Sequence, residues 1–131
     1  MTDLGNILIF LVYFGMAVIL LLSFLAAYTL LTDIHEWRLI RSGNTAVATA
    51  LGGAMIGFSL PLASAIVHTQ SLTDAIITAG IALVVQLSCF MAMRFVRRDA
   101  SAALTNGDMA EGVFLACTSV VLGILNAACL S

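Results

Sequence analysis

The topology of this chain follows from residues 82–99, which read ALVVQLSCFMAMRFVRRD. An apolar run ends there in three closely spaced arginines, Arg94, Arg97 and Arg98. This is the pattern of a membrane-spanning helix that reaches the cytoplasm, because short cytoplasmic loops carry an excess of arginine and lysine. The only other cationic side chains are Arg38 and Arg41, since the chain has no lysine.

Outward from this stretch, the chain contains four long segments without a charged residue, at 4–32, 42–67, 75–93 and 112–131. A helix needs about 20 predominantly apolar residues to cross a hydrocarbon core of about 30 Å. All five arginines lie in two of the breaks, between the first and second segments and between the third and fourth. The sequence therefore predicts four spans, with both termini on the side of the membrane opposite the cytoplasm.

The composition excludes a soluble globular domain. Hydrophobic residues make up 62% of the 131 residues and charged residues 9%, whereas a soluble domain carries about 25% charged residues. The spans use most of the chain, so we expect one membrane domain over residues 1–131. The sequence has no phosphate-binding loop, nucleophile elbow or zinc motif, and its three cysteines are not paired in a CxxC. We expect no enzymatic activity, no cofactor, no metal and no nucleic-acid partner.

The two halves of the chain have the pattern of an internal repeat, over residues 4–67 and 74–131. Each half has a span, an arginine-bearing stretch, a turn and a second span rich in small residues. The turns contain Gly43-Asn44 and Gly107-Asp108, and Asn44 and Asp108 are suited to cap the following helix. Because each unit has two spans, both units have the same orientation. The predicted fold is an all-α membrane four-helix bundle built from two parallel-oriented repeats.

Small residues indicate which helices pack closely. Gly53 and Gly57 form a GxxxG motif with Gly52 beside it, and Gly123 with Ala127 repeats the spacing in the last span. Such rows let helix backbones approach each other in lipid, where no hydrophobic force drives helices together. We expect the second and fourth spans to lie centrally. The GxxxG row either faces another span of the same chain or a second subunit.

Three polar residues are candidates for an intramembrane site. Gln86 and Asn126 are amides within the third and fourth spans, and their positions along the helices predict different depths without direct pairing. Their ordinary use is an interhelical hydrogen bond; lining a pore is the alternative. Glu111 begins the fourth span, where it forms either a capping box with Asp108 or a proton or cation site.

Gly- and Ala-rich segments occur in both halves of the chain and include 43–48, Gly52, Gly53, Gly57, 60–65, 107–110, Gly112 and 126–128. In these residues the sequence resembles the YjfL-type family of small bacterial inner membrane proteins. The resemblance implies a bacterial inner membrane location, with both termini in the periplasm. The family is a duplicated two-span domain of unknown function without established catalytic or ligand residues. Its relatives are associated with envelope-stress proteins of the phage-shock type and with ATP-grasp ligases, so the resemblance implies a membrane platform for a peripheral protein.

Two functions follow from these observations. The first is a homo-oligomeric membrane interaction or anchor module linked to envelope stress, whose arginines set topology and contact lipid headgroups or a cytoplasmic peripheral protein. The second is an oligomeric channel or small transporter that is lined by the second and fourth spans, through Thr49, Ser59, Thr118, Ser119 or Asn126. The one-sided arginine distribution opposes insertion in two orientations, which small multidrug transporters and fluoride channels commonly show.

Overall fold

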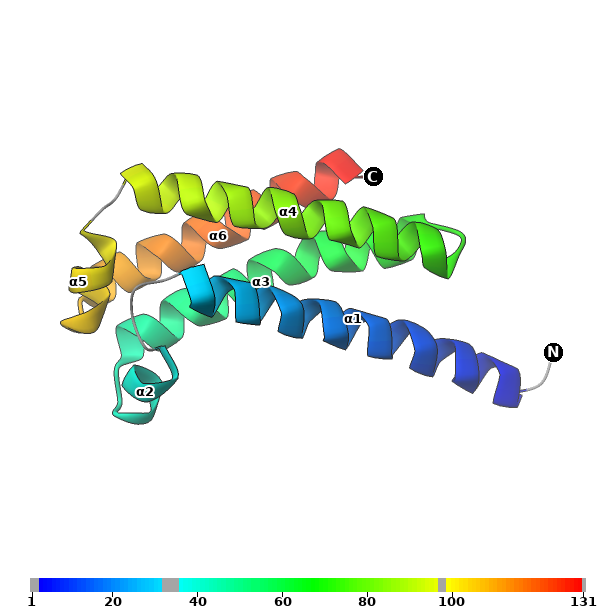
Figure 1. Cartoon of the computed structure of the whole chain (residues 1–131), viewed down its shortest axis with the longest axis horizontal. Coiled ribbons are helices and arrows are strands. Elements are labelled where there is room, and N and C mark those ends of the chain that lie inside the picture. The colour runs from blue at the N-terminus through cyan, green and yellow to red at the C-terminus, as the bar shows by residue number, and fades with distance from the viewer. Residues whose placement is uncertain (1–2, 32–35, 97–98, 131) are drawn as a thin grey trace.

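The computed structural model describes residues 3–31, 36–96 and 99–130, and these form helices joined by turns. Figure 1 shows the helices in chain order: α1 (Asp3–Leu31), α2 (Glu36–Arg41), α3 (Thr45–His68), α4 (Leu72–Val96), α5 (Ala100–Thr105) and α6 (Met109–Leu130). The predicted all-α fold is confirmed.

Four helices among the described residues, α1, α3, α4 and α6, are long and apolar enough to cross a membrane. They run roughly along one axis, with α2 and α5 at one end of the bundle and both chain termini toward the other (Figure 1). The 29 residues of α1 extend over about 43 Å at 1.5 Å per residue. This helix is longer than the ~30 Å hydrocarbon core, so it tilts or projects beyond the core.

Helix α3 is the centre of the bundle, as predicted for the second span. In an apolar stretch of 18 residues within α3, half of the residues are buried. The buried share of the corresponding stretch is 22% in α4 and α6 and 11% in α1. Helix α3 contacts each of the other five helices, and α6 most extensively. The fourth span, α6, is no more buried than α4, because one side of the α3–α6 pair remains uncovered.

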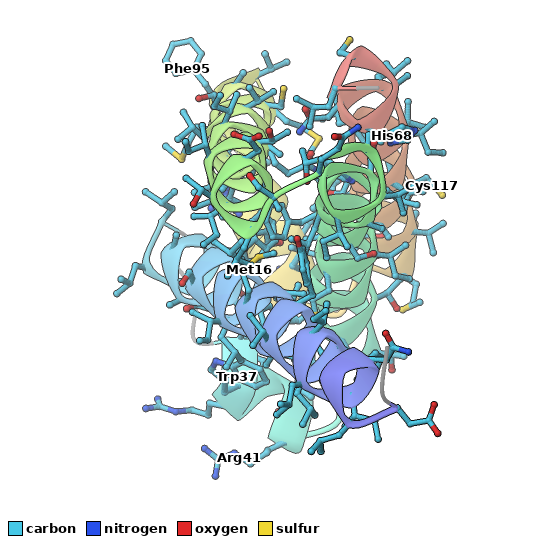
Figure 2. All side chains as sticks on the ribbon, turned by 90° about the vertical axis from the view of Figure 1, so that its right-hand side faces the viewer. Met16, Trp37, Arg41, His68, Phe95 and Cys117 are labelled. Carbon is cyan, nitrogen blue, oxygen red and sulfur yellow. The ribbon has the colours of Figure 1, made fainter. Side chains whose placement is uncertain are left out.

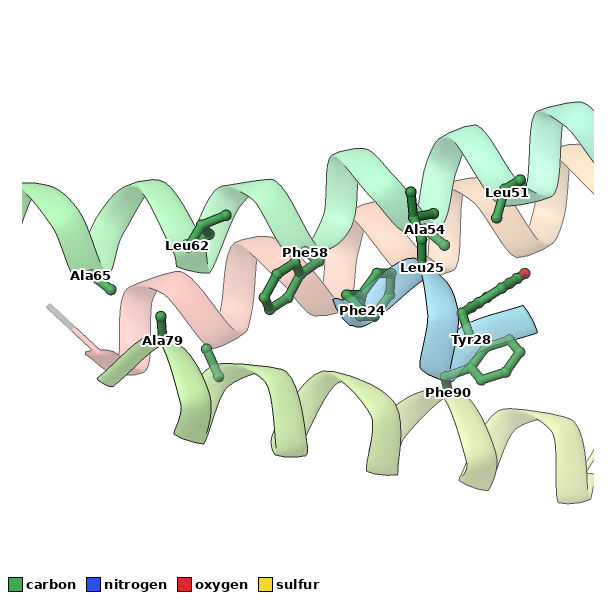
Figure 3. Close-up of a cluster of buried hydrophobic side chains, with 11 residues drawn as sticks. Phe24, Leu25, Tyr28, Leu51, Ala54, Phe58, Leu62, Ala65, Ala79 and Phe90 are labelled. Atoms are coloured by element: carbon green, nitrogen blue, oxygen red, sulfur yellow. The ribbon is translucent and has the colours of Figure 1, made fainter. Parts of the chain in front are cut away.

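Aromatic rings attach α1 to the bundle near its carboxyl end. Phe24 stacks on Phe58 of α3 with ring centroids 4.7 Å apart, and Tyr28 packs on Phe90 of α4 at 4.3 Å. Figure 3 shows these rings in one buried cluster between α1, α3 and α4. The amino-terminal half of α1 presents exposed apolar side chains, as expected of a helix that faces lipid.

The turns after α2 and α5 have the same hydrogen bonds. The Asn44 N–H donates to Leu39 O, and the Asp108 N–H donates to Ala103 O, both at 2.9 Å. Before each lies a glycine with positive φ, Gly43 at 95° and Gly107 at 81°. This is the backbone geometry of a Schellman turn, which favours glycine. Equivalent residues of the two turns are 64 positions apart in the sequence. The internal repeat over residues 4–67 and 74–131 remains a prediction.

Candidate functional site

The backbones of α3 and α6 touch along a row of small residues, which we call the small-residue seam: Ala46, Gly53 and Gly57 on α3, and Gly112, Ala116, Ser119 and Gly123 on α6. A methyl carbon on Gly123 would lie 2.6 Å from the carbonyl carbon of Gly57, and one on Gly57 would lie 2.8 Å from that of Ser119. Neither position has room for a side chain. The GxxxG motif therefore faces another helix of the same chain.

Not every small residue grouped by spacing lies in this seam. Gly53, Gly57 and Gly123 do, and Ala127 extends it, because the Ala127 carbonyl accepts a hydrogen bond of 3.3 Å from the Ser64 hydroxyl. Gly52 does not: a methyl group there would meet nothing within 4 Å among the described helices. One residue corresponds to about 100° of helix rotation, which turns Gly52 away from α6 while Gly53 contacts it.

The two intramembrane amides form what we call the amide junction. Gln86 of α4 and Asn126 of α6 are buried, at 4% and 8% exposure. The Gln86 amide donates to Ser119 O at 3.2 Å. The Asn126 amide donates to Ala82 O at 3.2 Å and to Gln86 Oε1 at 3.4 Å. The junction thus joins α4 to α6 at the small-residue seam.

The prediction that Gln86 and Asn126 lie at different depths without pairing is wrong. It assumed that the third and fourth spans end at the same level. Figure 1 shows instead that α6 stops short of the turn between α3 and α4. Asn126, near the carboxyl end of α6, therefore lies level with the middle of α4 and contacts Gln86.

The chemistry of the amide junction is that of helix packing. Its two side chains do not titrate, and their N–H groups are bonded to backbone or side-chain oxygens of the neighbouring helix. Throughout the described residues, every buried side-chain nitrogen or oxygen has a hydrogen-bond partner. Interhelical hydrogen bonds of this kind contribute about 0.6 kcal/mol each on average.

Glu111 is buried in the first turn of α6, at 8% exposure. Asp108 caps this helix, since its Oδ1 accepts from the N–H groups of Ala110 and Glu111 at 3.1 and 3.4 Å. The Asp108 N–H, which a complete capping box pairs with the Glu111 carboxylate, donates to Ala103 O in the preceding turn. The structure thus confirms the part of the predicted capping box in which the Asp108 side chain accepts from backbone N–H groups.

The arginines are not equivalent. Arg38 and Arg41 are exposed on α2. Arg94 is only partly exposed, and its guanidinium carbon lies 5.9 Å from the centre of the Phe90 ring, within cation–π range. Arg97 and Arg98 lie outside the described residues. Arg94 therefore packs against the bundle, unlike Arg38 and Arg41.

A second polar cluster was not predicted. Glu36, at the start of α2, is 3% exposed, and both its charge and that of Arg94 act on the Tyr28 hydroxyl. Tyr28, Glu36 and Arg94 come from α1, α2 and α4, and the three groups interact electrostatically. The signal in the sequence is the helical spacing of Glu36 with Leu39 and Ile40, which places all three on one face of α2.

A groove runs along the side of the α3–α6 pair that α1 and α4 leave uncovered. We call it the outer groove; it has a volume of about 520 Å³ and is lined by Thr49, Gly52, Gly53, Ile56, Ala116, Cys117, Val120 and Val121. Its lining is almost entirely apolar. Figure 2 shows Cys117 at this outer side of α6, pointing away from the bundle.

Residues 1–130 match the family described as Domain of Unknown Function (DUF350). The chain is 36% identical over 128 residues to the UPF0719 inner membrane protein YjfL of Escherichia coli (strain K12), covering 98% of this chain and 97% of that protein. It is 30% identical over 118 residues to the UPF0719 transmembrane protein YshE of Bacillus subtilis (strain 168), covering 88% of each. No solved structure matches the chain.

Proposed function

This chain belongs to the DUF350 family, and we propose that it is an inner-membrane anchor that acts by binding other proteins rather than by catalysis. The inner-membrane location is supported by the name of its Escherichia coli relative. The non-catalytic role is supported by the amide junction, where the intramembrane polar side chains hold helices together. The proposed orientation places α2 and α5 in the cytoplasm, because the arginines lie at that end of the bundle.

The observation that carries this proposal is the outer groove. Lipid chains are as apolar as leucine side chains, so helices associate in a bilayer through close packing of small residues. Gly52 lines the groove, and a methyl carbon added to it would meet nothing within 4 Å among the described residues. Packing within the chain therefore does not require a glycine at position 52. We assign the groove to a helix of a second copy, which makes the proposed anchor a homo-oligomer.

The exposed arginines support a second part of the proposal, a peripheral protein bound at the α2 and α5 end. The resemblance to the YjfL-type family makes an envelope-stress protein of the phage-shock type the first candidate. Because Arg94 is partly buried, its replacement would disturb the bundle as well as any docking surface. Arg38 and Arg41 are the residues to neutralise when recruitment from the cytoplasm is tested.

Cysteine cross-linking in membrane vesicles tests self-association directly. A variant with Cys89→Ser and Cys129→Ser retains Cys117 at the rim of the groove, exposed in the single chain. Oxidation should link two copies of this variant. The matched control keeps only Cys129, which is also exposed but does not line the groove, and it should cross-link less. Gly52→Leu, which fills the groove, should abolish the Cys117 link.

Two results would count against the proposed oligomer: equal cross-linking of the Cys117 and Cys129 variants, or a Cys117 link that survives Gly52→Leu. Reaction of each thiol with a membrane-permeant maleimide shows that both remain accessible. Cross-linking is performed at several protein-to-lipid ratios, because random collision falls with dilution in the bilayer whereas a specific interface persists.

The alternative function, a channel, receives less support. The hydroxyls of Thr49, Ser59 and Thr118 each bond a carbonyl of their own helix, at 2.7, 2.7 and 2.8 Å. Asn126 is engaged in the amide junction. Ion flux in liposomes that is lost in Gln86→Leu, with the fold retained, would favour the channel over the anchor.

A further inference from the structure

The short helix α2 has two different faces. Glu36, Leu39 and Ile40 point inward, and Leu39 and Ile40 pack against a buried cluster that includes Ala46 and Val47 of α3. The opposite face carries Trp37, Arg38 and Arg41, all exposed, with Trp37 at 53%. Positions 37 and 41, and positions 38 and 41, are neighbours on a helix surface. We call these three residues the basic face of α2.

The basic face is held in a fixed place by the packing beneath it. Because Leu39 and Ile40 are tied to the core, α2 cannot rotate its charged side inward without losing those contacts. The helix lies at the end of the bundle, with α1 ending just before it in the chain, and Figure 2 shows Arg41 projecting away from the bundle. We place this end of the bundle at the level of the lipid headgroups, because arginine and tryptophan are enriched at that boundary.

A comparison with α5 shows that the fold does not require these side chains. Helix α5 has the sequence ASAALT, the same length as α2, and leads into the same glycine turn. It contains neither an aromatic nor a basic residue. The same backbone geometry therefore forms without Trp37, Arg38 or Arg41. We infer that these three side chains, which share one outward face, serve binding rather than folding.

We propose that the basic face of α2 binds the phosphate headgroups of anionic phospholipids in the leaflet at which α2 lies. A guanidinium group makes paired hydrogen bonds to phosphate oxygens. Tryptophan is favoured at the boundary between headgroups and hydrocarbon. Two arginines and one tryptophan on a packed helix thus match an anionic headgroup in charge, hydrogen bonding and depth. This use of α2 is separate from self-association through the outer groove.

Trp37 is the only tryptophan of the chain, so its fluorescence reports on the lipid beside α2. The full chain is reconstituted into phosphatidylcholine vesicles that contain a minor fraction of brominated lipid, either phosphatidylglycerol or phosphatidylcholine with the same brominated chains. Bromine quenches tryptophan only at short range. Brominated phosphatidylglycerol should quench Trp37 more strongly than brominated phosphatidylcholine, and the preference should shrink at high salt as charges are screened.

The double variant Arg38→Gln/Arg41→Gln should remove the preference. Each basic residue near an anionic surface contributes about a fivefold gain in affinity, so loss of both should lower the relative affinity for phosphatidylglycerol by about 30-fold. Arg38→Lys/Arg41→Lys is the matched control, since it keeps the charge but not the paired hydrogen bonds. This control should retain most of the preference. Circular dichroism verifies that all three chains are equally helical.

Equal quenching of the parent chain by the two lipids would overturn the proposal. So would a preference for phosphatidylglycerol that the double glutamine variant leaves intact, because the lipid would then bind elsewhere. Since no other protein is present, a preference that depends on both arginines can only arise from lipid. The lipid proposal is tested apart from the peripheral protein proposed above, because the vesicles contain only the chain. Co-purification of a protein through Arg38 and Arg41, together with equal quenching by the two lipids, would assign the basic face to that protein and overturn the lipid proposal.

Discussion

Two adjacent glycines of α3, Gly52 and Gly53, should respond in opposite ways to the same added methyl group. In Gly53→Ala, the new carbon would lie 2.9 Å from the carbonyl carbon of Ala116 and closer still to the Cα and Cβ atoms of that residue. Side chains essentially never approach that closely, so α3 and α6 must separate. In Gly52→Ala the methyl group meets nothing within 4 Å among the described helices.

The magnitudes follow from two opposing effects. Replacing glycine by alanine within a helix stabilises it by up to about 1 kcal/mol. Overpacking a close contact costs about 1–3 kcal/mol. For Gly53→Ala the second effect exceeds the first, and we expect a net loss of about 1 kcal/mol in the free energy of unfolding. For Gly52→Ala only the first effect acts, and we expect a gain of up to about 1 kcal/mol.

The assay is unfolding in mixed detergent micelles followed by circular dichroism, at a dilution where the chain is monomeric. Dilution matters because a second copy in the outer groove would contact Gly52. The two variants have the same composition and substitute neighbouring positions of one helix, so each controls for the other. Equal changes in stability, or a less stable Gly52→Ala, would refute the placement of Gly53 in the small-residue seam and Gly52 outside it.

Three further predictions concern the polar and small residues around the core. Gly123→Ala should lower the free energy of unfolding by about 2–3 kcal/mol, more than Gly53→Ala, because the three atoms nearest to the added methyl group are all backbone atoms of α3. A smaller loss in the same micelle assay would mean that the helices separate easily. A double-mutant cycle of Gln86→Leu and Asn126→Leu should give a coupling of about 0.6 kcal/mol, whereas additive effects would show that the amides do not interact. The cycle of Glu36→Gln and Arg94→Gln should give a coupling above about 0.5 kcal/mol, and a value near zero would place the two charges in separate environments.

The span pattern is visible in the sequence because burial in lipid demands it over about 20 consecutive residues. A single break, such as that at Arg94 to Arg98, is then enough to end a span. The two turns were visible for a different reason: Gly43 and Gly107 adopt positive φ, which few other residues tolerate, and Asn44 and Asp108 follow each turn as helix caps. The spans and turns depend on residues that are neighbours in the sequence, so a sequence pattern is enough to predict them.

The contacts between helices were not visible, because they depend on relative length and rotation. Gln86 and Asn126 meet only because α6 stops short of the α3–α4 turn (Figure 1). No pattern of residues in the sequence predicts where α6 ends relative to that turn. Gly52 and Gly53 are identical in sequence terms, and only the direction of α6 around α3 separates them. Arg94 likewise belongs to a charged cluster along the chain, while the Phe90 ring holds it against the bundle.

Because Gly52 and Gly53 point in different directions, α3 packs on α6 through one face and leaves the face with Gly52 uncovered. Its contact with α6 uses Gly53 and Gly57 completely, since neither has room for a methyl group. The chain therefore has no spare GxxxG motif to offer a partner, and self-association through that motif would require α6 to leave. The outer groove shares Gly53 and Ala116 with the seam, but a helix seated in it would lie on the uncovered side of the α3–α6 pair and would not displace α6. An assembly through the groove would keep the amide junction and the fold of each copy intact, which is what a stable membrane anchor requires.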